Sequence, residues 1–244
     1  YFSIAFKSIV HKKLRTFLTT LGILVGIASV ISMVALGEGT QKKIKDNIMK
    51  MGSNLVYVFN QVNRGGNRNA ATSSRNRLTI ENGVAIEREA KSVEAVSPIV
   101  HYSTIASYGN KNLETMVSGT NSKFLEVNNF SIKYGSFFDE AAVRSNAGVA
   151  VLGHTLVKDL YDGKNPVGSY IKINRMNFLV IGCLEEKGAE SWRDQDNTVL
   201  IPVTTVQKTL AGQNFVSLLS VQVKDQDLMD MAVDEMTEIL RKDR

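Results

Sequence analysis

The sequence has one cysteine, Cys183, and only three histidines in 244 residues. A single thiol excludes an intramolecular disulfide. Cys183 lies in the apolar run FLVIGCL, where a free cysteine usually behaves as a small buried hydrophobe. A reactive thiol needs a cationic neighbour, and none follows Cys183 before Lys187. Zinc sites need clustered ligands, so the scattered histidines His11, His101 and His154 predict no metal site.

Motifs of catalysis are also lacking. No G-x-x-x-x-G-K-[ST] phosphate loop and no G-x-S-x-G serine elbow occurs in the chain. The acidic residues that stand close together are Asp139 with Glu140, Glu185 with Glu186, and Asp194 with Asp196. Such local pairs are typical of solvated loops and strand surfaces. We therefore expect no catalytic residue and no cofactor-binding residue in this chain.

Clusters of basic residues without neighbouring acids occur in two short regions. Lys7, Lys12, Lys13 and Arg15 stand in residues 1–16, which contain no acid, and a second group of arginines stands within 64–77. A nucleic-acid surface would place basic and aromatic side chains together on a folded element. The observed distribution argues against nucleic acid as a partner.

One long apolar run, FLTTLGILVGIASVISMVAL over 17–36, follows the first basic group. A helix of this length is about 30 Å long, which matches the hydrocarbon core of a bilayer. The positive flank of Lys12, Lys13 and Arg15 predicts that the N-terminus lies in the cytoplasm and that the rest lies outside it. We expect a bacterial cytoplasmic (inner) membrane protein with its main domain extracytoplasmic or periplasmic.

Two alternatives concern this N-terminal region. Ala35-Leu36-Gly37 is similar to a signal-peptidase site, but signal h-regions run about 7–15 residues and this run is longer, which favours an anchor. Residues 1–16 read as an amphipathic helix on the cytoplasmic leaflet, or else as the first turns of the membrane helix.

Two pairs of glycines are candidates for special roles in this helix. Gly22 and Gly26 form a small-xxx-small pair, which suits packing against a second membrane helix. The helical pattern continues through Gly37 and Gly39 to Met51, so 37–53 is predicted to be a stalk helix. Each of these two glycines weakens the helix by about 1 kcal/mol against Ala, which makes them hinge candidates or merely weak points.

Beyond the stalk the pattern mixes strands and helices. The expected strands are 55–59, 93–100, 104–108, 113–119, 148–153, 170–173, 178–185, 198–202 and 215–223, and the expected helices are 80–90, 122–127, 154–160, 204–210 and 227–241. Thr79 suits the N-cap of the helix over 80–90, Gly109-Asn110 suits a hairpin turn, and 60–77 reads as a polar loop. Without a strict βαβ repeat, an α+β fold is indicated.

The order of these elements resembles a known family. KLRTFLTTLGILVGIASVISMVALGEGTQKKI, MGSNLVYVF, YGSFFDE, GVAVLGHTLVKDLYDGKNPVGSYIKIN, FLVIGCLEEKG and DNTVLIPVTTVQK stand in the order found in MacB-type ABC transporter permeases. The resemblance covers essentially the whole chain. It implies the first transmembrane helix plus the periplasmic core domain, in a chain that ends before the family's remaining membrane helices.

What the resemblance implies is mechanotransmission, in which cytoplasmic ATP binding and hydrolysis drive extracytoplasmic motions that export a substrate. The implied partners are an ABC ATPase subunit or domain that carries ATP-Mg, a second copy in a homodimer, the lipid bilayer and, where present, a periplasmic adaptor and outer-membrane channel. The known substrate classes of the family are macrolides, peptides, toxins and lipoprotein-like molecules.

We expect an α+β extracytoplasmic domain of two lobes on one N-terminal transmembrane helix. A porter-like lobe is predicted over 54–119 and 215–244, with a mixed α/β lobe, 120–214, inserted in it. Two alternatives to the efflux permease stay open. One is a single-pass sensor or ligand-binding domain, and the other is the lipoprotein-release or cell-division branch of the same permease superfamily.

Overall fold

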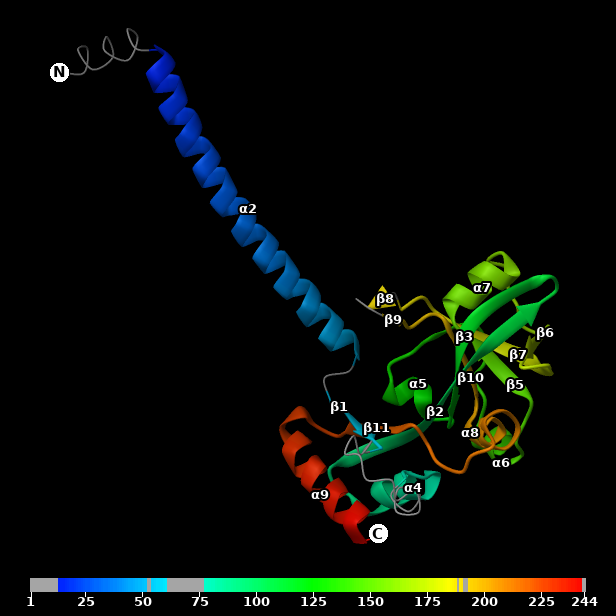
Figure 1. The fold of residues 1–244 in the computed structure, drawn as a ribbon. Coiled ribbons are helices and arrows are strands. Elements are labelled where there is room, and N and C mark those ends of the chain that lie inside the picture. The colour runs from blue at the N-terminus through cyan, green and yellow to red at the C-terminus, as the bar shows by residue number, and fades with distance from the viewer. Residues whose placement is uncertain (1–12, 52–53, 61–76, 188, 191–192, 243–244) are drawn as a thin grey trace, which may run out of the picture. The chain divides into compact units, whose positions relative to one another are not determined.

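The computed structural model describes residues 13–51, 54–60, 77–187, 189–190 and 193–242. The chain divides into two compact units, Tyr1–Met49 and Lys50–Arg244. Lys12 and the predicted interfacial helix before it lie outside the described residues, as do 61–76 of the predicted polar loop. Figure 1 shows the ribbon of the chain.

The first unit consists of one long helix, α2, over Lys13–Met51. It passes through Gly37 and Gly39 without a break. The large apolar side chains of its apolar run are exposed, and Phe17–Gln41 is long and apolar enough to cross a membrane. Nothing lies within 4 Å of a Cβ added at Gly22, Gly26, Gly37 or Gly39. Helix pairing and hinge motion at these glycines therefore stay predictions.

The second unit holds the remaining elements. Its strands are β1 (Leu55–Phe59), β2 (Val93–Tyr108), β3 (Lys111–Thr120), β4 (Ile132–Gly135), β5 (Val149–Leu152), β6 (Tyr170–Ile173), β7 (Met176–Leu184), β8 (Ala189–Glu190), β9 (Arg193–Asp194), β10 (Thr198–Pro202) and β11 (Leu218–Val223). Its helices are α4 (Ile80–Glu89), α5 (Phe124–Val127), α6 (Glu140–Arg144), α7 (His154–Tyr161), α8 (Val203–Thr205), η1 (Val206–Ala211), η2 (Gln226–Leu228) and α9 (Met229–Lys242). The domain is α+β.

Nine of the described strands form one sheet that closes on itself over part of its length, and β8 and β9 pair with each other in a separate two-stranded sheet. Along the chain of pairings, β2 pairs with β3, β3 with β10, β10 with β5, β5 with β7, β7 with β6, and β6 again with β2. The ring contains both parallel and antiparallel pairs. One face of the ring is fully buried and aliphatic, with Val117, Leu152, Ile171, Val180 and Val199 all at 0 % exposure. This ring is the main core of the domain.

Strand β2 joins the ring to the rest of the sheet. Its first part pairs with β11, which in turn pairs with β1, and from Val100 onward it pairs with β3. Sixteen residues of strand extend about 50 Å. The sequence predicts two strands here, 93–100 and 104–108, but β2 is continuous because each half finds its own hydrogen-bonding partners. Helices α4 and α9 pack against each other, and α4 also packs on β2 (Figure 1).

Other local predictions are confirmed or need small corrections. Thr79 caps α4 in a full capping box with Asn82, as its sequence position predicts. The turn between β6 and β7 contains only Asn174 and Arg175, both left-handed with φ of 46° and 70°, so it is tighter than the four-residue connection expected. The helix expected over 204–210 is a short α-helical turn followed by the π-helical segment η1.

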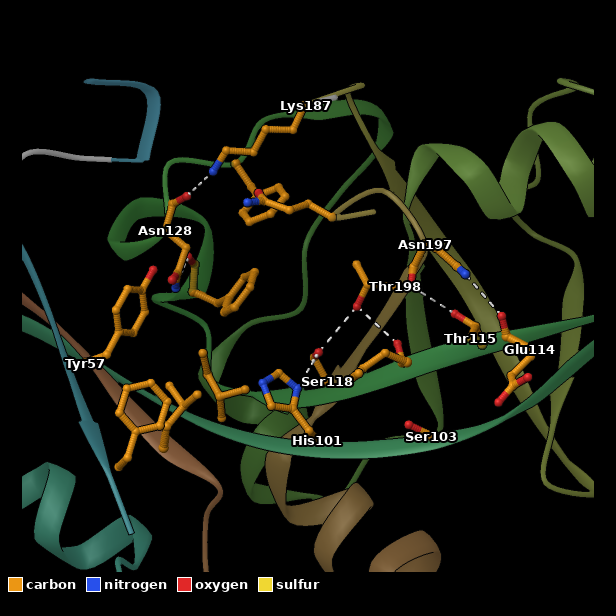
Figure 2. A pocket seen from close by; sticks show the side chains of 17 residues that line it. Tyr57, His101, Ser103, Glu114, Thr115, Ser118, Asn128, Lys187, Asn197 and Thr198 are labelled. Atoms are coloured by element: carbon orange, nitrogen blue, oxygen red, sulfur yellow. Dashed lines mark hydrogen bonds between the residues drawn. The ribbon is translucent and has the colours of Figure 1, made fainter. Parts of the chain in front are cut away.

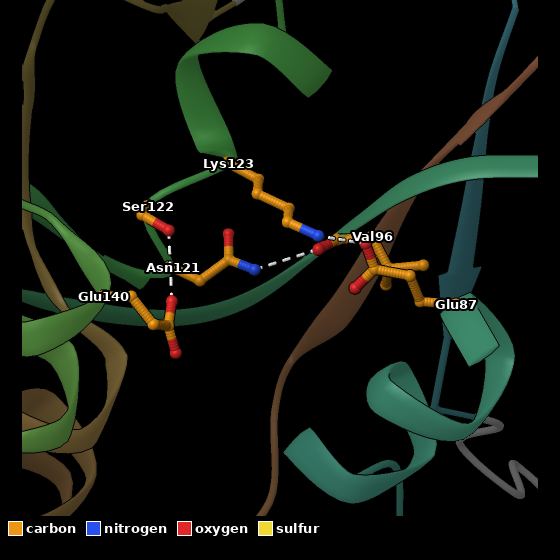
Figure 3. Close-up of polar contacts among 6 residues, drawn as sticks. All are labelled: Glu87, Val96, Asn121, Ser122, Lys123 and Glu140. Carbon is orange, nitrogen blue, oxygen red and sulfur yellow. Dashed lines mark hydrogen bonds and ion pairs between the residues drawn. The ribbon is translucent and has the colours of Figure 1, made fainter.

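The segment after β3, where the sequence places the boundary between two lobes, binds three different elements (Figure 3). Asn121 Nδ2 donates to the Val96 carbonyl of β2 at 2.9 Å. Ser122 Oγ donates to Glu140 at the start of α6 at 3.1 Å, and Lys123 forms an ion pair with Glu87 of α4. Strands from both predicted lobes pair within one sheet, because β10 pairs with β3. The two-lobe division stays a prediction.

Candidate functional site

A cavity of about 870 Å³ lies beside β1, β2, β3 and β10 (Figure 2). This volume is within the range of about 300–1,000 Å³ that small-molecule sites occupy. Strand alternation places His101 and Ser103 of β2, and Met116 and Ser118 of β3, on its wall.

One end of the cavity is aromatic. Tyr57 and Phe59 come from the edge strand β1, with ring centroids 6.3 Å apart. Phe124, the first residue of the short helix α5, stacks on Phe130, which follows the helix, with ring centroids 5.5 Å apart. Phe59 is 64 % exposed, so this end presents a large apolar face that a ligand can cover.

Lys187 supplies the positive charge at the cavity. Its ammonium donates to the Asn128 carbonyl at 2.7 Å and lies 4.1 Å from the centre of the Phe130 ring. Asn128 is itself fixed, since its side-chain oxygen accepts from Ser220 Oγ at 3.0 Å. The Lys187 charge is thus positioned over an aromatic ring, an arrangement typical of a cation–π contact.

The other end of the cavity is polar and internally hydrogen-bonded. Ser118 Oγ lies 3.3 Å from His101 Nδ1 and 3.3 Å from Thr198 Oγ1, and Thr198 donates to the Met116 carbonyl at 3.1 Å. Asn197 Nδ2 donates to the Glu114 carbonyl at 3.1 Å. The hydroxyls and amides of this end bind the strands to one another, so the wall is rigid and suited to binding.

Three titratable groups outside the cavity have pKa values shifted by burial or by a hydrogen bond. Burial raises the pKa of the Cys183 thiol, in agreement with the buried position predicted for it. Burial likewise raises the pKa of Tyr161, whose ring stacks on Tyr108 at 4.0 Å. Hydrogen bonds from Lys111 lower the pKa of Asp162. None of these side chains lines the cavity.

The residues that the sequence singles out lie elsewhere. Gly22, Gly26, Gly37 and Gly39 are on α2, Lys13 is its first residue, and Arg15 is exposed near its start. The cavity residues carry no signal in a single sequence, because they come from separate strands that only pairing brings together.

Comparison with known proteins identifies the family. A family model described as the MacB-like periplasmic core domain matches residues 16–239. The chain belongs to this family. The residues that it matches cover α2 almost from its start and nearly all of the second unit, which confirms the resemblance seen in the sequence.

Relatives and solved structures agree with the membership in the MacB-like periplasmic core domain family. Proteins named macrolide export ATP-binding/permease protein MacB are 35 % identical over 98 % of this chain in Chlorobium luteolum and 33 % identical over 97 % in Bdellovibrio bacteriovorus. The alignment spans 36 % of each relative, so the chain spans about a third of their length.

Two solved structures share the fold of this MacB-like domain. The periplasmic region of MacB from Actinobacillus actinomycetemcomitans has a TM-score of 0.66 at 24 % identity, covering 82 % of this chain and 88 % of that one. The extracellular domain of the ABC-type transporter YknZ from Gram-positive bacteria has a TM-score of 0.64 at 18 % identity, covering 78 % and 94 %.

Proposed function

We propose that this chain is the membrane-anchored, extracytoplasmic part of an ABC transporter permease that works by mechanotransmission. The observation that carries the proposal is α2, one unbroken helix of 39 residues whose candidate membrane span ends at Gln41, ten residues before Met51. A helix that runs on past the apolar span can carry motion from one side of a membrane to the other.

The assembly follows from the same proposal. The N-terminus lies in the cytoplasm, and an ABC ATPase, fused or separate, binds ATP-Mg there. Two copies pair in the membrane through the face that carries Gly22 and Gly26. The relatives are named for macrolide export, which supports an efflux role for this chain. A periplasmic adaptor and an outer-membrane channel are the further partners of this proposal, where the cell has them.

The domain offers a stiff element to receive the motion. The closed strand ring and the 16-residue β2 form one hydrogen-bonded unit. A displacement at either end of β2 moves the cavity wall, because His101 and Ser103 are on this strand. We propose that the cavity opens and closes on exported substrate as the ATPase cycles.

Orientation is the first test. Alkaline phosphatase fused after Asn60 should be active in cells, whereas a green fluorescent protein fused before Tyr1 should fluoresce, because each reporter works on one side of the membrane only. Active phosphatase at Tyr1, or release of the domain free of the membrane, would refute the proposed topology.

Coupling is the second test, made in the complete transporter reconstituted in vesicles. Gly39→Pro interrupts the helix at its membrane exit and should abolish export while ATP hydrolysis continues, because proline breaks a helix interior. Gly39→Ala is the matched control. The Ala variant keeps the helix intact, and so it distinguishes the two roles considered for Gly39. Its export stays normal if Gly39 is only a weak point of the helix, and its export falls if Gly39 is a hinge. Normal export by the Pro variant would contradict a rigid lever.

A further inference from the structure

Three side chains that are distant in sequence meet beside the cavity. His154 is the first residue of α7, Glu186 follows β7, and Asp196 precedes β10. Each offers one ligand atom, and these three atoms all lie within 4.8 Å of one another. His154 Nδ1 is 4.0 Å from Glu186 Oε1. We propose that they form a site for one divalent transition-metal ion, with Zn²⁺ as its best-suited occupant.

The chemistry of the ligands selects the ion. One imidazole nitrogen and two carboxylate oxygens suit Zn²⁺, whereas Mg²⁺ and Ca²⁺ prefer oxygen ligands alone. Two ligands of a tetrahedral Zn²⁺ with bonds near 2.0 Å lie about 3.3 Å apart. Glu186 is 68 % exposed at its side chain, so its carboxylate has room to change rotamer, and small shifts of the other two side chains would complete the approach from separations of at most 4.8 Å to this spacing.

The three ligand-bearing segments are held together by main-chain hydrogen bonds next to the ligands. Thr155 N donates to the Asp196 carbonyl at 3.2 Å, which fixes the start of α7 to the segment before β10. Lys187 N donates to Asp196 Oδ1 at 3.0 Å, which fixes the segment after β7 to the same residue. The metal would therefore join segments that the fold already brings together.

Burial distinguishes this group from acids gathered on a surface. Asp196 is 4 % exposed and the His154 side chain 26 %, so only Glu186 faces solvent freely. The ammonium of Lys187, the residue next to Glu186, is bound to the Asn128 carbonyl and lies over Phe130. Asp196 and His154 would therefore supply two enclosed ligands. The exposed Glu186 carboxylate lies on the side from which an ion would enter.

Occupancy has a consequence for the cavity. Lys187, Gln195 and Asn197 line it, and each is adjacent in sequence to a proposed ligand. A bound ion would hold these three residues in place, so that one wall of the cavity becomes more rigid when metal is present. The site thus goes beyond the proposed transport cycle and does not depend on it.

The test measures metal directly, on the full chain in detergent after removal of metal by a chelator. Zn²⁺ titrated against a colorimetric competitor should bind at one ion per chain and raise the midpoint of thermal unfolding. His154→Gln and Glu186→Gln should each weaken binding at least about tenfold. Co²⁺ should give a visible absorption band that both variants lose.

Controls separate this site from others on the chain. His11→Gln and Glu185→Gln remove a histidine and an acid that are not proposed ligands, and these variants should bind Zn²⁺ as the unaltered chain does. Asp196→Asn keeps an acceptor for Lys187 N and should also lose Zn²⁺. If Asp196→Asn fails to fold, the double variant His154→Gln, Glu186→Gln takes its place and should lose Zn²⁺ binding. Absence of bound Zn²⁺, or equal binding by that double variant and the controls, would overturn the proposal.

Discussion

Glu235 of α9 accepts two hydrogen bonds from Ser92, one from its main-chain nitrogen at 3.1 Å and one from its hydroxyl. This pair joins the C-terminal helix to the residue that precedes β2. The hydrogen bonds from Ser92 lower the pKa of Glu235. The two residues are 143 positions apart, so this contact attaches α9 to the part of the domain formed by α4 and β2.

Glu235→Gln should therefore lower the thermal unfolding midpoint at neutral pH. A carboxyl whose pKa is lower when folded stabilises the fold above its unfolded pKa, about 4.3, and loses that contribution as pH falls through the folded value. The difference between variant and parent should shrink below pH 4.3. Glu238→Gln, exposed on the same helix, is the control, and a difference independent of pH would contradict the mechanism.

Arg175→Gly should stabilise the domain. Arg175 has φ of 70° in the two-residue turn between β6 and β7, and a left-handed conformation costs a non-glycine residue about 1 kcal/mol. Asn174, with φ of 46°, is already a favoured residue for its position. Denaturant unfolding of the chain in detergent measures the gain. A loss of stability would show that Arg175 makes a contact worth more than the strain.

Gly153→Ala should destabilise the fold by about 1–3 kcal/mol or more, because forced overpacking displaces the backbone. A Cβ at Gly153 would stand 2.2 Å from the Asp196 carbonyl oxygen. Gly148→Ala, five residues earlier and with nothing within 4 Å of its added Cβ, is the matched control and should be nearly neutral. Equal effects of the two changes would contradict the packing described at α7.

Cys183 should resist thiol reagents in the folded chain. It is 1 % exposed, and burial raises the pKa of its thiol, so little thiolate is present at neutral pH. Labelling with an aromatic disulfide should proceed only after denaturant is added. Fast labelling of the native protein would mean that β7 opens readily.

Local chemistry made much of the fold predictable. Thr79 as an N-cap, Gly109-Asn110 as a hairpin turn and the apolar runs at β5 and β10 depend on neighbouring residues, so a single sequence predicts them. The break predicted within β2 and the start predicted for β11 at residue 215 are wrong, because strand extent depends on pairing partners. Strand β2 runs unbroken where β11 and β3 pair with successive parts of it.

Neither the cavity nor the proposed metal site was predictable from the residues alone. His101 reaches Ser118 through the register of β2 and β3, and His154 reaches Glu186 through the return of β7 to the start of α7. The three histidines are far apart in the sequence and predict no metal site, whereas the structure places His154 beside two acids. Contacts between distant segments depend on strand order, which no local pattern encodes.

The sequence by itself determined the apolar helix of α2, the α+β character of the domain and the membership in the MacB-like family, since helix length, hydropathy and motif order are properties of the chain. Only the tertiary structure decided that the strands close into a ring and that the cavity lies beside it. Closure depends on β6 pairing with both β2 and β7, a choice made by packing of the whole domain.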